Sequence, residues 1–167
     1  MSFLDSADAT SIADQVRTAC IRPGVVAEYF LAKVDAREAS IHAFVSLDPP
    51  GVRKQAAEFA DPGLSGMLAG VPIGIKDNLD TRDHPTGFYS PIYDNNQPSR
   101  DAHAVALLRQ AGAVIIGKTH TTEFAYMKTG PTRNPHDLNR TPGSSSAGSA
   151  AGMAAGFFPV ALGTQTA

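Results

Sequence analysis

The 167-residue sequence has one cysteine, little net charge and no basic leader at its N-terminus. The single cysteine, Cys20, excludes an intrachain disulfide framework, and we expect a structural thiol because no histidine lies near it in the sequence. A formal net charge of −2 argues against a protein that binds nucleic acid through phosphate contacts. Asp5 and Asp8 stand where a secretory signal would carry basic residues, which favours a cytoplasmic protein.

The segment 144–167 is uncharged and has the length of a membrane span, but four glycines and Pro159 interrupt it. A buried helix followed by a buried strand is therefore the expected structure, and no membrane partner is predicted. The five histidines are scattered without a pair at metal-ligand spacing, so the sequence predicts neither a metal site nor a cofactor. His120 follows a predicted strand, where a hydrogen-bonded structural histidine is expected.

Hydrophobic content of 43% and charged content of 18% are typical of a soluble globular protein, and the length favours one domain. Apolar spacing predicts helices over residues 10–20, 24–39 and 52–60, with a short strand over residues 43–47. The first 60 residues contain no obvious chemical motif, so we expect them to be scaffold.

Residues 70–78 alternate as a strand does, with Val71, Ile73 and Ile75 on one face. Lys76 lies on the other face beside only proline and glycine, which leaves space for a second loop to approach its ammonium. Asp77 should point to the opposite face, so it is not an obvious ion-pair partner for Lys76. The alternative is an exposed lysine at the end of a strand.

A helix from residue 101 to Gly112, followed by the apolar strand 113–116, is typical of the second half of a βαβ unit with parallel strands. Residues 81–99 and 129–140 are expected to be loops, residues 121–127 a short helix, and residues 158–163 another buried strand. The order of these elements indicates an α/β fold.

Residues 112–119 match the phosphate-loop pattern G-x-x-x-x-G-K-[ST]. That motif needs a strand before its first glycine and a flexible loop between its glycines. Here a predicted helix precedes Gly112, and the four middle residues are apolar and mostly β-branched. We therefore expect a strand whose N–H groups are committed to a sheet, and we reject nucleotide binding.

A segment rich in glycine and serine, residues 140–152, precedes the apolar residues 153–162. If a helix begins there, Gly148, Gly152 and Gly156 share one of its faces, because they are spaced four apart. Each glycine costs about 1 kcal/mol in a helix interior, so a stripe of three indicates that another backbone packs against that face. A serine-rich loop at the N-terminus of such a helix suits binding of a polarised carbonyl. A flexible linker is the alternative, but a linker would lack the apolar continuation.

A lysine on a buried strand, a Gly/Ser loop and then a strand ending in Gly-Thr-Gln-Thr-Ala resemble the amidase signature family. The resemblance extends from about residue 43 onward and includes residues 70–77, 112–123 and 130–135. Its most specific part is Pro-Gly-Ser-Ser-Ser-Ala-Gly-Ser at residues 142–149. It implies the amidase-signature fold, a mixed or parallel central sheet flanked by helices, which this chain would contain only in part.

The family cleaves or transfers amide nitrogen with a Ser–cis-Ser–Lys triad. By motif position, the resemblance implies that Lys76 is the catalytic lysine and that Ser145 is the cis-serine that relays a proton. Supporting roles would fall to Ser146, Ser144 and Gly143, and backbone N–H groups of the oxyanion hole to Thr166 and Ala167. The family pattern continues as Gly-Thr-x-Thr-(Gly/Ala)-Gly-Ser, which places the nucleophile two positions beyond residue 167.

This chemistry fits the surroundings predicted for Lys76. A lysine that accepts a proton must be neutral, so its pKa must fall from about 10.4 toward about 7–8. Removal from water supplies such a shift, and the face that Lys76 shares with Pro72 and Gly74 has no carboxylate.

The sequence therefore predicts the N-terminal part of an amidase, with residues 1–60 as helical scaffold and residues 61–167 as part of the catalytic core. Without the nucleophile we expect this chain to be inactive alone. Its expected partners are a small-molecule amide and the rest of an amidase chain or a second copy. The alternatives are a non-catalytic binding fragment and an amidotransferase A-type subunit, but the latter's longer serine-rich insertion is lacking between Phe124 and Gly130.

Overall fold

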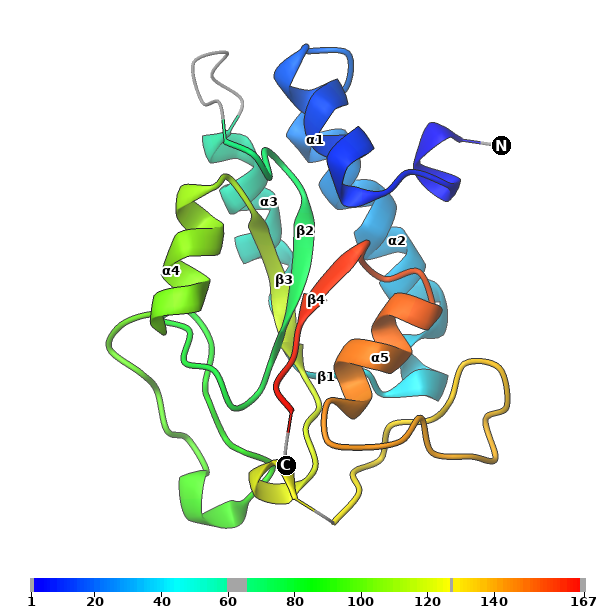
Figure 1. Cartoon of the computed structure of the whole chain (residues 1–167), viewed down its shortest axis with the longest axis vertical. Helices are drawn as coiled ribbons and strands as arrows, with labels where there is room; N and C mark the ends of the chain where they lie inside the picture. The colour runs from blue at the N-terminus through cyan, green and yellow to red at the C-terminus, as the bar shows by residue number, and fades with distance from the viewer. Residues whose placement is uncertain (1, 60–65, 127, 166–167) are drawn as a thin grey trace.

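The computed structural model describes residues 2–59, 66–126 and 128–165, and its centre is a four-stranded sheet in the order β1-β3-β2-β4 (Figure 1). The strands are β1 (Phe44–Leu47), β2 (Pro72–Lys76), β3 (Val114–Thr119) and β4 (Val160–Leu162). Strand β2 runs parallel to both β3 and β4, whereas β1 is antiparallel to β3. The expected α/β fold with a mixed sheet flanked by helices is confirmed.

The helices lie on both sides of this sheet. Figure 1 shows α1 (Ala9–Arg17), α2 (Pro23–Ile41) and α5 (Ala147–Ala154) on one side of the strands and α4 (His103–Gln110) on the other. Helix α4 connects β2 to β3, which completes the expected βαβ unit. Helix α3 (Pro49–Glu58) is anchored to the edge of β3, because the side-chain amide of Gln55 bonds to both the N–H and the carbonyl of Ile115.

The three helices expected before residue 60 all form, although their bounds differ from the expected ones. Helix α1 begins where the Asp8 carboxylate accepts a hydrogen bond from the Ser11 N–H at 2.7 Å. It ends at Arg17, so Cys20 lies after the helix and is exposed, contrary to the expected structural thiol. Ala60, the expected last residue of the third helix, lies outside the described residues.

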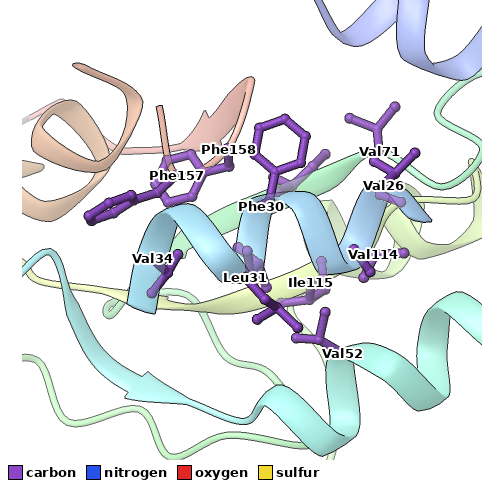
Figure 2. Packing of buried hydrophobic residues seen from close by; sticks show 14 of the residues in the cluster. Val26, Phe30, Leu31, Val34, Val52, Val71, Val114, Ile115, Phe157 and Phe158 are labelled. Atoms are coloured by element: carbon purple, nitrogen blue, oxygen red, sulfur yellow. The ribbon is translucent and has the colours of Figure 1, made fainter. Parts of the chain in front are cut away.

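The main apolar core lies between α2 and the sheet. Figure 2 shows Val26, Phe30, Leu31 and Val34 of α2 close to side chains of the strands and to Phe157 and Phe158. All five residues of β2 are buried, as expected for a strand covered on both faces. Among the described residues, no helix is long and apolar enough to cross a membrane.

Residues 114–119, the centre of the phosphate-loop match, form strand β3. This strand pairs with β1 on one side and β2 on the other, and the N–H of Ile115 donates to the Gln55 side chain, so its backbone is committed to contacts within the fold. The prediction that this segment is a strand is confirmed.

The prediction of a short helix over residues 121–127 is wrong. The described part of this segment contains one 3-10 turn, η3 (Glu123–Ala125), in which Phe124 and Ala125 have φ values of 48° and 58°. The N–H of Phe124 donates to the carbonyl of Phe88 at 3.0 Å, so a contact with a distant loop replaces helical hydrogen bonding. Met127 lies outside the described residues. Two other 3-10 turns are η1 (Phe3–Asp5) and η2 (Pro91–Tyr93).

The close backbone approach expected at the glycine stripe of α5 is confirmed at Gly148, whereas Gly152 leaves room for a side-chain ring. A Cβ on Gly148 would lie 2.2 Å from the carbonyl oxygen of Ala43 and 2.3 Å from the N of His120, and a Cβ on Gly152 would lie 2.3 Å from the ring of Phe158. Gly156 lies beyond the end of α5 with φ +75°, so its inclusion in the helix was wrong. Close backbone packing at Gly148 therefore fixes the start of α5 against the residues that precede β1 and follow β3.

Gly148→Ala should lower the free energy of unfolding by about 3 kcal/mol or more, because overpacking against backbone outweighs the gain of about 1 kcal/mol in helix propensity. Gly24→Ala is the matched control, since nothing lies within 4 Å of a Cβ at this helical position. Urea unfolding followed by circular dichroism would measure both variants. Equal stability of the two would contradict the close approach described for Gly148.

Candidate active site

Lys76 is the last residue of β2 and is fully buried. Its register partner on the adjacent parallel strand is Thr119, and Gly74, two residues earlier, leaves room for the ring of Phe158. The alternative of an exposed lysine at a strand end is therefore wrong. The expected small neighbours do allow other parts of the chain to close over this face of the strand.

Within the described residues, the Lys76 amine has three polar contacts, and all of them are to uncharged groups. Its Nζ lies 2.8 Å from Ser145 Oγ, 2.8 Å from Thr164 Oγ1 and 3.3 Å from the Thr164 carbonyl oxygen. Burial lowers the pKa of Lys76 from 10.5 to about 8. A substantial fraction of this lysine is therefore neutral near pH 8, as a proton acceptor must be.

The Ser145 loop precedes α5 and contains a cis peptide bond between Ser144 and Ser145. The carbonyl of Ser145 accepts hydrogen bonds from the Thr122 N–H at 3.0 Å and the Thr121 hydroxyl at 3.2 Å. The loop is thus tied to the segment that follows β3, and the Ser145 side chain is held in a buried position beside Lys76.

Of the other predicted site residues, only some lie in the cluster around Lys76. Ser146 joins the cluster, because its Oγ lies 3.0 Å from the Thr164 carbonyl and 3.3 Å from the Thr164 N. Ser144 and Gly143 are exposed, and Gly143 has φ +95° in the turn that leads into the loop. Thr166 and Ala167 lie outside the described residues.

Two residues of this cluster, Thr164 and Asn78, were not predicted from the sequence. Thr164 follows β4 and contacts Lys76, and the Asn78 Nδ2 donates to Thr164 Oγ1 at 3.0 Å. One signal was available, because the carboxyl ends of neighbouring parallel strands meet at one edge of a sheet, and β2 and β4 end just before Asn78 and Thr164.

A second buried lysine, Lys118 of β3, has the opposite environment. Its Nζ lies 3.2 Å from the Asp77 carboxylate, 2.7 Å from Thr86 Oγ1 and 3.0 Å from the Pro85 carbonyl. Burial lowers the pKa of Lys118, but the Asp77 carboxylate opposes that shift. As expected, Asp77 is not paired with Lys76. It forms an ion pair with Lys118 instead.

His120 is buried after β3, and its Nδ1 has no hydrogen-bond partner within the described part of the chain. The expected hydrogen-bonded structural role is therefore not met at Nδ1. Its ring packs edge-on against Tyr89, with the ring centroids 5.5 Å apart. Burial lowers the pKa of His120 to about 4, so the ring is neutral at pH 7.

In comparisons with known proteins, a family model described as Amidase matches residues 25–167. A glutamyl-tRNA(Gln) amidotransferase subunit of Acidothermus cellulolyticus is 40% identical, over 99% of this chain and 35% of that protein. The chain thus spans about a third of the length of the curated relatives it matches.

Two solved structures are similar over nearly the whole chain. The peptide amidase of Stenotrophomonas maltophilia superposes with a TM-score of 0.86 at 29% identity, covering 93% of this chain and 35% of that protein. A 6-aminohexanoate cyclic dimer hydrolase has a TM-score of 0.84 at 33% identity, covering 96% of this chain and 34% of that protein.

The low pKa of Lys76 predicts a specific dependence of stability on pH. Between pH 8 and 10.5 the unfolded lysine is protonated while the folded one is not, so the free energy of unfolding should rise with pH in this window. The rise from Lys76 amounts to about 3 kcal/mol. Urea unfolding at pH 7.5 and 10.5 would measure it as the difference between the unaltered chain and Lys76→Met.

Lys54→Met is the control, because this lysine is exposed on α3 and should leave the rise intact. A Lys76→Met variant with the same pH dependence as the unaltered chain would show that Lys76 keeps its ordinary pKa when folded.

Proposed function

Because this chain belongs to the amidase signature family, we propose that it supplies the lysine and the cis-serine of a Ser–cis-Ser–Lys triad. The reaction is hydrolysis of a carboxylic amide C–N bond. The observation that carries this proposal is the buried 2.8 Å contact between Lys76 Nζ and Ser145 Oγ. It joins a lysine of lowered pKa to a hydroxyl that can both accept and donate a proton.

In the proposed mechanism, neutral Lys76 accepts the proton of Ser145, and Ser145 in turn takes the proton of the nucleophilic serine. That serine attacks the amide carbonyl and forms a C–O bond. The proton then returns along the same path to the amide nitrogen as its C–N bond breaks. In the second step water gives up a proton along this path and attacks the acyl ester, the C–O bond to the serine breaks, and the serine oxygen regains its proton. No cofactor enters any of these steps.

The nucleophile is proposed to lie two positions beyond residue 167, by the register of the family pattern. Thr166 and Ala167 are proposed to offer backbone N–H groups to the oxyanion that forms during attack. A preorganised donor of this kind lowers the activation free energy by about 3–4 kcal/mol. On this proposal, residues 1–167 alone bind parts of the substrate but do not turn it over.

The two parts of the chain are proposed to divide the work. Residues 1–60 act as helical scaffold, and residues 61–167 form the part of the catalytic core that holds Lys76 and the serine loop. Helix α2 supplies a large share of the apolar residues packed on the sheet, which supports the scaffold role.

The proposed substrate is a small-molecule amide, and the proposed protein partner is the remainder of an amidase chain or a second copy. A second candidate is an amidotransferase subunit, which several curated relatives are named to be. Only five residues separate Phe124 from Gly130, which favours the small-molecule amidase. Failure to co-purify with tRNA-amidating partner subunits is the expected result, and stable co-purification would favour the second candidate.

Intact mass and the downstream reading frame would first establish whether a Gly-Ser continuation follows residue 167. In a longer chain with that continuation, Lys76→Ala and Ser145→Ala should each lower the rate of amide hydrolysis by at least about 10²–10⁴-fold, because each removes a proton-transfer group. The assay is ammonia release from simple carboxamides.

Lys54→Ala and Ser40→Ala serve as controls, since they make the same changes at exposed positions. Full activity in the Lys76→Ala or Ser145→Ala variant would refute the assigned roles. Absence of a Gly-Ser continuation, together with saturable binding of amides by residues 1–167, would instead support a non-catalytic binding fragment.

A further inference from the structure

The hydroxyl of Thr164 lies between two nitrogen donors near the carboxyl end of β2. Lys76 Nζ is 2.8 Å from Thr164 Oγ1, and Asn78 Nδ2 is 3.0 Å from the same oxygen. A hydroxyl oxygen has two lone pairs, so these two donors occupy both of them. Thr164 therefore acts as an acceptor toward Lys76, and its own hydrogen points elsewhere.

The backbone of Thr164 is held as firmly as its side chain. Ser146 Oγ donates to the Thr164 carbonyl at 3.0 Å and accepts from the Thr164 N–H at 3.3 Å. The same carbonyl lies 3.3 Å from Lys76 Nζ. Asn78 on one side and Ser146 on the other thus fix two acceptor oxygens of one residue beside the amine.

The three contacts of Lys76 Nζ can be satisfied by either charge state of the amine. An uncharged lysine has two N–H bonds and one lone pair, whereas the ammonium has three N–H bonds and no lone pair. The Thr164 carbonyl is an acceptor, and the Thr164 hydroxyl accepts from Lys76 and Asn78, so in the neutral form these two oxygens take the two N–H bonds of the amine. The remaining contact, to Ser145 Oγ at 2.8 Å, is then the direction of the lone pair.

We propose that Thr164 and Asn78 are positioning residues, which aim the lone pair of neutral Lys76 at the Ser145 hydroxyl. This inference rests on the proposed function, since it assigns the geometry of the same proton transfer. Asn78 holds Thr164 without bringing a charge near the amine. The nearby carboxylate of Asp77 is engaged by Lys118, so the described groups that face Lys76 Nζ from β2, β4 and the serine loop are uncharged.

The first test changes the charge at residue 78 in the chain as it stands. With lysine labelled at ¹³Cε, the Lys76 signal is assigned by its loss in Lys76→Met and titrated by NMR. Asn78→Asp should raise the pKa of Lys76 by about 1–3 units, because an opposite charge now lies beside it. Asn95→Asp makes the same change at an exposed loop residue and should leave that pKa where it is.

The second test measures how firmly the Lys76 side chain is held. Thr164→Val removes the hydroxyl acceptor with little change in volume, so the ¹³Cε order parameter of Lys76 should fall clearly. Thr164→Ser keeps the hydroxyl and should restore it. Equal order parameters in the two variants, or an Asn78→Asp variant with an unshifted Lys76 pKa, would overturn this inference.

The two proposals fail in different ways. An ordinary Lys76 pKa in the unaltered chain would count against the proposed proton transfer itself. A lowered Lys76 pKa that responds to neither Asn78 nor Thr164 would leave the triad intact and remove only the positioning role.

Discussion

The contact between the Lys76 amine and the Ser145 hydroxyl is the constraint on which the rest of the site depends. A lysine ammonium taken out of water without a counter-charge is costly, and the group responds by giving up its proton more readily. Across the described residues, the fold maintains that situation by placing hydroxyl and carbonyl oxygens around Nζ. A carboxylate at the same place would restore the ordinary basicity and end the capacity to accept a proton near neutral pH.

The two buried lysines lie on neighbouring strands but differ in whether a carboxylate lies beside the amine. Lys118 pairs in register with Ile75, and Lys76 pairs with Thr119, so the two amines leave the sheet on opposite faces. Asp77 lies on the face of Lys118 and forms an ion pair with it. The alternation of β2 thus separates this carboxylate from the Lys76 amine.

Much of this arrangement could be predicted from local pattern. Alternation over residues 70–78 predicted the strand and the direction of Asp77 correctly, because successive side chains of a strand point to opposite faces. It left open whether Lys76 is buried or exposed, since burial depends on loops that close over the strand from elsewhere in the chain. The helix over residues 121–127 was wrong, since a bond between Phe124 and a distant loop overrides local preference. Thr164 was missed for a similar reason, because its role arises from strand order, which no single segment specifies.

The missing side chain of Gly148 has a consequence for tolerance to substitution. Its N–H donates to the carbonyl of His120, and its Cα approaches the main chain of Ala43 and His120. The contacts that hold the serine loop in place are thus made by main-chain atoms, which every residue type has. The Ser145 loop therefore keeps its position through main-chain contacts, which do not depend on the identity of the His120 side chain.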